Sequence, residues 1–292
     1  MMMNRLLKNI RSYLSLCKAK VSFFASLSAA TGFLLTAHSL RTTLPVLITG
    51  VFLMACGACA LNHYQERDTD ALMARTAGRP LPRGKIKPGH AFCFSMALIC
   101  SGCIVLLFTD TLAAPLLGLA AILWYNGFYT RFKTGNAFAA IPGALIGAIP
   151  PAIGWTAGGG SLADPRLAAL CLFFFMWQVP HFFLHLLVFG KEYEKINLPS
   201  LTAVFTEPQL DRLTFQWFFS AAVSLQLVIF YGLLQSLFVQ ISLLAVSLWL
   251  VVKGINLMRE HKPSYRNVFE KINYFILTVM LLIFLDKLPP LL

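Results

Sequence analysis

Long apolar stretches without a charged residue alternate along this chain with short segments that are rich in charge. Most of these stretches have close to the about 20 residues that a helix needs to cross roughly 30 Å of hydrocarbon. The pattern therefore predicts transmembrane helices rather than the core of a soluble domain. The charge-free stretches cover residues 21–40, 42–65, 91–109, 111–130, 137–163, 167–189, 213–252 and 272–285.

One of these stretches is too long for a single span. Residues 213–252 form 40 consecutive positions without a charge, and Gly232 lies near the middle, where a turn would separate two helices. With this division, we expect an all-α, polytopic membrane protein with nine transmembrane helices. Short turns and longer polar loops join these helices, and we expect a single transmembrane domain over residues 1–292.

The composition agrees with a membrane protein. Hydrophobic residues make up 58% of the 292 residues and charged residues only 12%, which is more apolar surface than a soluble domain of this size can bury. The formal net charge of +12 does not point to nucleic acid, because the cationic residues flank the spans and form no free basic tail. The expected partners are the anionic headgroups of the lipid bilayer and a phosphorylated substrate.

The distribution of Lys and Arg predicts the orientation of the chain. If nine spans place successive loops on alternate sides, one side carries all but three of the 24 cationic residues. Positively charged loops stay on the cytoplasmic side of a cell membrane. We therefore expect a cytoplasmic amino terminus without a removable signal peptide, and cytoplasmic polar loops. The three exceptions are Arg41, Arg166 and Lys287.

Three potential oxygen ligands follow the second predicted span at a regular spacing. Asn62, Glu66 and Asp70 are each four residues apart, so on a helix they share one face. Oxygen ligands at a membrane edge suit Mg²⁺, which takes few carboxylates and completes its shell with water and phosphate oxygens. We therefore expect these three residues to bind Mg²⁺ and to be catalytic. Such acids are also typical of a solvated loop in which they balance nearby arginines.

Two arginines close behind these ligands favour the metal site over the solvated loop. Arg75 and Arg79 lie five and nine residues after Asp70. A guanidinium group matches phosphate oxygens with forked, charge-assisted hydrogen bonds. Carboxylates at the end of an apolar helix are also costly unless they are paired or coordinated. Acids that hold a metal beside arginines are expected to bind a diphosphate.

The segment after the fourth predicted span places aromatic residues beside cations. Arg131 and Lys133 are candidates to bind phosphate, and Tyr125 is a candidate to stabilise an allylic cation with the face of its ring. Aromatic belts at membrane interfaces explain the same pattern without any catalysis. The sequence leaves both interpretations open.

A second polar cluster follows the sixth predicted span. His181 and His185 lie about one helical turn apart, which allows a shared ligand but is also typical of helix packing. Glu192 and Glu194 are two residues apart and do not share a helical face, so only Glu192 is a candidate metal ligand. Tyr193, which lies between them, is a candidate substrate contact.

The cysteines are expected to be packing residues. Two pairs, at positions 56 and 59 and at positions 100 and 103, have the spacing of redox or zinc sites. Both pairs lie within predicted spans among small and apolar residues, where cysteine packs helices together. The sequence also contains no recognisable Ser/His/Asp or Cys/His arrangement for a nucleophile.

Taken together, these segments resemble the UbiA superfamily of intramembrane prenyltransferases. A narrower resemblance is to the branch of this superfamily that farnesylates heme. The match runs in order along nearly the whole chain. The wider resemblance rests on Asn62-x-x-x-Glu66-x-x-x-Asp70 and on Arg75-Thr-x-x-Arg79-Pro-Leu-Pro. The narrower resemblance rests on residues 141–155, 177–182 and 273–286. Lys18-Ala-Lys20 is also similar to the start of the family's first span.

The resemblance implies a bundle of helices around a central cavity and Mg²⁺ as the cofactor. It implies farnesyl diphosphate as the donor, the 2-vinyl group of heme B as the acceptor, and heme O as a product for heme A synthase or terminal oxidase assembly downstream. Lys18 and Lys20 are further candidates to bind the donor. His181 and, less directly, His63 are candidates to contact the iron or a propionate of heme.

Three other functions fit parts of this pattern. A prenyltransferase that acts on an aromatic acid or a quinone precursor would share the first motif. A transporter would place ionisable residues deep in several spans, whereas here they gather at one face. A passive heme-binding assembly factor would need the histidines but not the acids, so that replacing Glu66 by Gln would leave its function intact.

Overall fold

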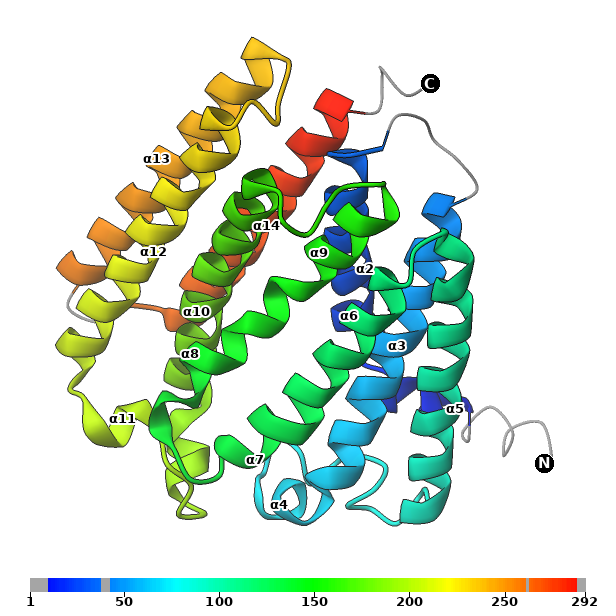
Figure 1. The fold of residues 1–292 in the computed structure, drawn as a ribbon. Coiled ribbons are helices and arrows are strands. Elements are labelled where there is room, and N and C mark those ends of the chain that lie inside the picture. The colour runs from blue at the N-terminus through cyan, green and yellow to red at the C-terminus, as the bar shows by residue number, and fades with distance from the viewer. Residues whose placement is uncertain (1–9, 38–42, 261–262, 288–292) are drawn as a thin grey trace.

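The computed structural model describes residues 10–37, 43–260 and 263–287, and within these ranges the chain is helical and has no strand (Figure 1). A short helical segment over 10–16 precedes the first long helix. Arg41 and the end of the predicted span 21–40 lie outside the described residues. The principal helices are α2 (Ala19–Leu34), α3 (Thr43–Gln65), α4 (Arg67–Leu72), α5 (Pro88–Leu106), α6 (Ala113–Ile122), α7 (Thr130–Phe132), α8 (Ala140–Gly143), α9 (Ile149–Ala157), α10 (Pro165–Glu194), α11 (Leu201–Val204), α12 (Glu207–Phe230), α13 (Leu237–Arg259) and α14 (Tyr265–Lys287).

The chain is a multi-pass membrane protein, as the apolar pattern predicts. Among the described helices, seven are long and apolar enough to cross a membrane. The count of nine spans stays a prediction, because Ala19–Leu34 has only 16 residues and the segment over 113–132 is not one regular helix. The seven helices are Thr43–Gln65, Pro88–Thr109, Ala137–Ala157, Pro165–Glu194, Glu207–Phe230, Leu237–Arg259 and Tyr265–Lys287.

The stretch over 213–252 divides into two helices, as expected. Helix α12 ends at Phe230 and α13 begins at Leu237, and Gly232 in the turn has φ +67°, a conformation that glycine adopts without a steric cost. Helix α12 begins earlier than its charge-free stretch. A capping box formed by Thr206 and Gln209 starts it at Glu207.

Prolines break one of the predicted spans into short segments. Residues 137–157 follow a single path but alternate between 3₁₀ and α geometry (η3, Ala137–Ala139; η4, Ala144–Gly147). Proline lacks the N–H that a helix needs and its ring clashes with the carbonyl four residues earlier. Pro142, Pro150 and Pro151 therefore prevent a regular α-helix here.

The span over 113–132 contains a π-helix, η2 (Leu123–Tyr129), between α6 and α7. Asn126, in the middle of η2, donates from Nδ2 to the carbonyl of Ala58 (3.1 Å) and to Oε1 of Gln65 (3.0 Å), both in α3. Gln65 in turn donates to the carbonyl of Asn126 (3.0 Å). These hydrogen bonds fix the π-helix η2 against α3. Short π-helical segments within α-helices are frequent at functional sites.

Helices α2 and α9 cross at two glycines. A Cβ atom on Gly154 would lie 1.7 Å from the carbonyl oxygen of Ala29, and one on Gly32 would lie 2.0 Å from the carbonyl oxygen of Pro151. Backbones approach this closely in membranes only where a residue has no side chain. The two glycines thus bring α2, which carries part of the cavity wall, directly onto α9.

Replacing Gly154 by Ala is expected to destabilise the protein by about 1–3 kcal/mol, because the added methyl group forces α2 and α9 apart. Thermal unfolding in detergent measures the effect as a lower Tm. Gly89→Ala is the matched control, since no other described part of the chain lies within 4 Å of a Cβ at that position in α5. An unchanged Tm for Gly154→Ala would contradict the close crossing.

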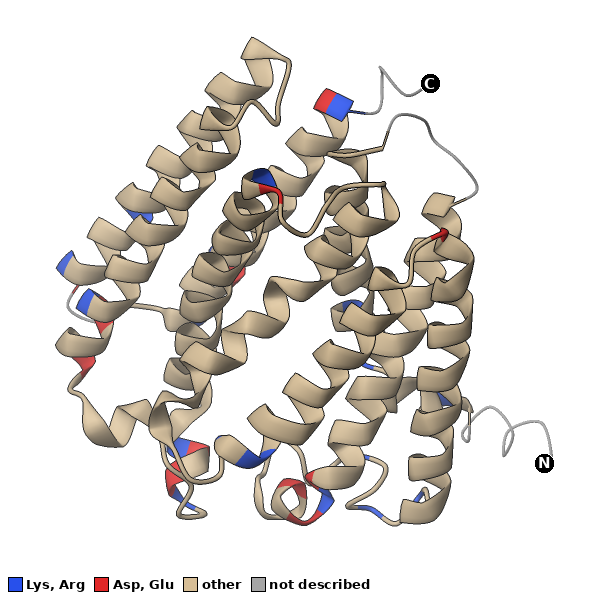
Figure 2. Ribbon diagram, in the orientation of Figure 1, with Lys and Arg blue, Asp and Glu red and all other residues tan. Residues whose placement is uncertain are grey.

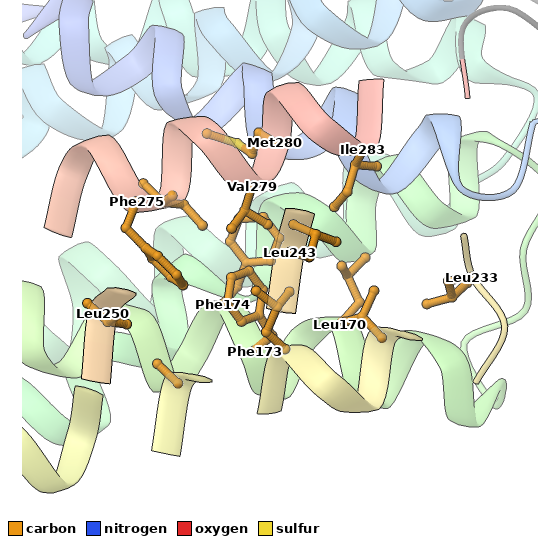
Figure 3. Close-up of a cluster of buried hydrophobic side chains, with 14 of the residues drawn as sticks. Leu170, Phe173, Phe174, Leu233, Leu243, Leu250, Phe275, Val279, Met280 and Ile283 are labelled. Atoms are coloured by element: carbon orange, nitrogen blue, oxygen red, sulfur yellow. The ribbon is translucent and has the colours of Figure 1, made fainter. Parts of the chain in front are cut away.

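The largest hydrophobic core joins α10, α12, α13 and α14 (Figure 3). Phe173 and Phe174 of α10 lie beside Val279 of α14, and the rings of Phe173 and Phe275 meet edge to face with centroids 6.2 Å apart. Edge-to-face pairs stabilise a contact beyond the area that they bury. This core sets the register of α14 against α10.

Charged residues gather at one end of the bundle, around α4 and the carboxyl end of α10 (Figure 2). At the opposite end, Asp164 pairs with Arg166 (2.6 Å) and Asp286 pairs with Lys287 (3.4 Å). Asp286 also accepts the backbone N–H groups of Gln235 and Ser236 before α13. The unequal distribution of charge agrees with the sequence-based expectation, and these two carboxylates at the sparse end have partners within the fold.

Candidate active site

A cavity of about 510 Å³ extends from the charged end of the bundle into its apolar interior. Its volume lies within the range of small-molecule sites in proteins. Apolar side chains from α2, α3, α10 and α14 form much of its wall. The polar and charged lining includes Lys18, Asn62, Glu66, Asp70, Arg75, Arg79, Lys133, Gln178, His181, His185, Tyr193 and Asn273.

The three expected oxygen ligands all line this cavity. Helix α3 ends at Gln65 and α4 begins at Arg67, but the helical hydrogen bonds continue across the junction. The amide of Glu66 donates to the carbonyl of Asn62 (2.9 Å), and the amide of Asp70 donates to the carbonyl of Glu66 (2.7 Å). The four-residue spacing therefore keeps its helical register, and Asn62, Glu66 and Asp70 face the same space.

Each of these side chains is paired with a different cation. Lys18 Nζ donates to Asn62 Oδ1 (3.3 Å), Lys133 pairs with Glu66, and Arg79 Nη1 donates to Asp70 Oδ2 (2.5 Å). The three cations come from the loop before α2, the end of α7 and the segment after α4. Tertiary structure thus collects them from positions that are far apart in the sequence.

The charged cluster has more positive than negative charge. Lys18, Lys133 and Arg79 oppose the carboxylates of Glu66 and Asp70, and Arg75 adds a further guanidinium group to the cavity wall. A polyanion that enters this end meets a net attraction. Cations without an anion close by would repel one another, so the two carboxylates stabilise the cluster.

Burial and pairing together decide the charge states at this end. Burial disfavours the charged form of Glu66, but the Lys133 ammonium group, with hydrogen bonds from Lys133 and Asn62, outweighs burial and lowers the pKa of Glu66. Burial also disfavours the Lys133 ammonium, yet Glu66 outweighs it and raises the pKa of Lys133. Both groups therefore stay charged at neutral pH. Burial lowers the pKa of Lys18.

One carboxylate oxygen in the cluster is buried without a partner. Asp70 is fully buried, and while its Oδ2 accepts a hydrogen bond from Arg79, its Oδ1 has no hydrogen-bond donor among the described residues. A buried carboxylate oxygen without a partner is costly and is suited to a cation that enters with a ligand. In the part of the chain that the structure describes, no group of three or more His, Cys, Asp or Glu residues is placed to hold a metal. A metal here needs Asn62 and ligand oxygens as well.

The remaining residues that the sequence singled out divide into two sets. Arg75, His181, Tyr125 and Tyr193 line the cavity. Lys20 and Arg131 are exposed and do not line it, and His63 is buried in α3 behind its wall. Glu192 also lies outside the wall, where its Oε2 accepts the backbone N–H of Arg75 (3.3 Å).

Aromatic rings form the wall beside the charged cluster. Tyr125 and Tyr129 of η2 stack with ring centroids 5.9 Å apart, and Tyr129 stacks on Phe182 of α10 at 5.8 Å. All three rings line the cavity. Trp124 does not, because its indole N–H donates to the carbonyl of Pro142 (2.9 Å) on the other side of η2. The sequence could not separate these neighbouring aromatic residues, since the π-helix decides which of them point inward.

A helical bundle with an apolar cavity and a cluster of cations and carboxylates at one end defines an intramembrane enzyme for a substrate with an anionic head and an apolar body. Residues 22–279 match the model of the UbiA prenyltransferase family, and the chain belongs to this family.

Relatives with a known name cover most of the chain. Protoheme IX farnesyltransferase of Geobacter sulfurreducens is 39% identical over 192 residues, which cover 66% of this chain and 71% of that protein. The protein of the same name from Nitratidesulfovibrio vulgaris (strain DP4) is 32% identical over 279 residues, which cover 96% of this chain and 93% of that protein. The resemblance inferred from the sequence motifs is therefore confirmed.

Solved structures confirm the fold. A UbiA homolog from Archaeoglobus fulgidus, bound to GPP and Mg²⁺, superposes with a TM-score of 0.67 at 13% identity and covers 94% of this chain and 99% of its own. A structure of digeranylgeranylglyceryl phosphate synthase gives a TM-score of 0.75 at 17% identity and covers 97% of this chain and 99% of its own. The predicted UbiA-like helical bundle is thus correct.

Proposed function

We propose that this prenyltransferase transfers a farnesyl group from farnesyl diphosphate to the 2-vinyl group of heme B, giving heme O. The observation that carries the proposal is the pairing of Asn62, Glu66 and Asp70 with Lys18, Lys133 and Arg79 at one end of an apolar cavity. The cations match a diphosphate, and the apolar interior matches a farnesyl chain and a porphyrin. The named relatives support the choice of heme as the acceptor.

A divalent cation, for which we propose Mg²⁺, fits the same cluster. Asn62, Glu66 and Asp70 would hold it, with Asp70 Oδ1 as the oxygen that lacks a donor. When bound, Mg²⁺ neutralises charge on the departing diphosphate. The relative from Archaeoglobus fulgidus binds Mg²⁺ together with GPP, which supports this assignment. Glu192 supports the site indirectly, by holding the backbone of Arg75.

The side chains of the cavity explain how the reaction proceeds. Lys18, Arg79 and Lys133 bind the diphosphate as the bond between its oxygen and farnesyl C1 breaks and the diphosphate leaves with the electron pair. The rings of Tyr125 and Tyr129 face the allylic cation that forms. The vinyl group attacks this cation with its π electrons. Water then adds to the carbon beside the porphyrin and loses a proton, which gives the hydroxyl group.

We propose that the charged end faces the cytoplasm in a cell membrane, because the Lys and Arg residues gather there. In this orientation the diphosphate head of the donor lies at the cytoplasmic end of the cavity, while its farnesyl chain and the porphyrin occupy the apolar interior. The product would pass to heme A synthase or to the assembly of a terminal oxidase.

A reconstituted reaction tests the proposal. Purified protein is incubated with heme B, farnesyl diphosphate and Mg²⁺, and the porphyrin is analysed by mass spectrometry. We expect a hydroxyethylfarnesyl heme, no product when EDTA is present, and recovery on adding excess Mg²⁺. An unmodified porphyrin beside a prenylated hydroxybenzoate in a parallel reaction would instead assign the chain to the quinone branch of the family. Without either product, the enzymatic assignment fails.

Lys18→Met is expected to raise the KM for farnesyl diphosphate by about 10- to 100-fold, because a charge-assisted hydrogen bond to phosphate is lost. Lys18 lines the cavity beside Asn62, whereas Lys20 is exposed two residues further on. Lys20→Met is therefore the matched control and keeps the KM of the unaltered protein. Equal KM values for the two variants would remove Lys18 from the diphosphate site.

A further inference from the structure

A histidine in the cavity is held in one orientation and one tautomer. His181 of α10 lies 2.9 Å, through Nδ1, from Oδ1 of Asn273 in α14. Asn273 donates its own Nδ2 to the carbonyl of Phe269 (2.7 Å), which fixes which side of the amide faces the histidine. An amide oxygen only accepts hydrogen bonds. Nδ1 of His181 must therefore carry the proton.

The second ring nitrogen of His181 is consequently a lone-pair donor. In a neutral imidazole one nitrogen bears the proton and the other does not, so Nε2 is unprotonated. His181 and Asn273 both line the cavity, and no hydrogen bond to Nε2 is present among the described residues. Histidines that bind a metal through one nitrogen typically donate the other N–H to an oxygen that orients the ring.

Aromatic neighbours restrict rotation of this ring. The His181 ring lies 5.2 Å from that of Trp177 and 4.8 Å from that of Phe269, between centroids. His185, one turn further along α10, differs from it. Its ring contacts Phe189 and Phe269, but it forms no hydrogen bond within the described part of the chain. Two histidines on one face of one helix also cannot occupy the opposite sides of a porphyrin plane.

A series of direct contacts connects His181 with the charged cluster. Its ring lies 5.9 Å from that of Phe182, which stacks on Tyr129 at 5.8 Å. The ammonium of Lys133 lies 5.7 Å from the Tyr129 ring and pairs with Glu66. A flat aromatic substrate beside His181 is thus adjacent to the ring wall that leads to the proposed diphosphate site.

We propose that Nε2 of His181 coordinates the iron of the porphyrin substrate, and that Asn273 is a positioning residue for this ligand. The inference rests on the proposed function, because it needs heme as the acceptor. Coordination fixes the distance between the porphyrin plane and α10, and hydrogen bonding by Asn273 keeps Nε2 directed into the cavity. The coordinated iron then holds the whole porphyrin in place, and with it the reacting vinyl group at the edge of the ring system.

Spectroscopy of the purified protein with heme B tests the ligand directly. We expect the Soret band of wild type to indicate one histidine ligand, His181→Gly to lose this signature, and added imidazole to restore it. His185→Ala is the matched control and keeps the signature. Asn273→Leu is expected to weaken heme affinity by about 10-fold and to shift the Fe–His stretch in resonance Raman spectra. Asn273→Asp is expected to retain ligation. An unchanged spectrum in His181→Gly overturns the proposal.

Metal-free protoporphyrin IX separates iron ligation from contacts to the propionates, which both porphyrins share. In wild type, we expect heme B to have a kcat/KM at least about 10-fold above that of protoporphyrin IX. This preference is expected to vanish in His181→Ala. A farnesyl diphosphate binding assay checks that this variant is folded. If wild type farnesylates both porphyrins equally, iron ligation is wrong while the proposed function stands. If wild type farnesylates neither, the proposed function itself is wrong.

Discussion

Asp70→Asn is expected to lower the kcat of farnesyl transfer by about 100- to 1000-fold, the effect of removing one charged group that stabilises a developing anion. Asp70 is fully buried at the cavity wall. One of its carboxylate oxygens pairs with Arg79, and the other has no donor in the part of the chain that the structure describes. Asn keeps the shape but removes the charge that a divalent cation requires. Mass spectrometry of the porphyrin product over time gives kcat directly.

The matched control for this variant is Asp68→Asn, two residues earlier on the same short helix. The Asp68 side chain is 85% exposed and pairs with Arg67 at the surface, so the same chemical change there is expected to leave kcat within about 2-fold. If both variants had wild-type activity, Asp70 would hold no essential cation. In that event the ion pair with Arg79 alone would explain why the Asp70 carboxylate is buried.

Lys133→Met is expected to reduce kcat/KM for farnesyl diphosphate by about 100-fold or more, because one change removes the proposed phosphate contact and the partner of Glu66. The variant is also expected to lose stability, since Glu66 is then a largely buried carboxylate without its ion pair. Steady-state kinetics and thermal unfolding in detergent measure the two effects separately.

Arg131→Met is the control, because Arg131 is exposed and lies outside the cavity wall. The double variant Glu66→Gln with Lys133→Met separates stability from catalysis. Removing both charges is expected to restore much of the Tm without restoring turnover. Recovery of turnover in the double variant would show that the pair acts only in folding.

Much of the fold follows from local features that the sequence contains. The end of α3 at Gln65 and the turn at Gly232 were both predicted, because charge marks the limit of a span and glycine marks a turn. The spacing of Asn62, Glu66 and Asp70 also predicted a shared face, since only the helical period was needed. The helix boundary at Glu66 does not change this result, because the i to i−4 hydrogen bonds continue through it.

Other features of the site depend on contacts between distant parts of the chain. Neither Lys133 nor Arg131 is distinguished by its local sequence, yet the π-helix turns Lys133 inward to Glu66 and leaves Arg131 exposed. His63 looks as suitable for heme as His181 when residue type alone is considered. Packing buries His63 in α3 and places His181 in the cavity.

By itself, the sequence determined that this is a helical membrane protein, which end carries the charge, and that Asn62, Glu66 and Asp70 share one face. These properties depend on hydropathy and helical period, which act over a few residues at a time. Only the tertiary structure decided which cation meets which carboxylate, which rings face the cavity, and that Asn273 orients His181. Such pairings depend on how α10, α14 and η2 pack, and on glycines and prolines that set where helices cross and bend.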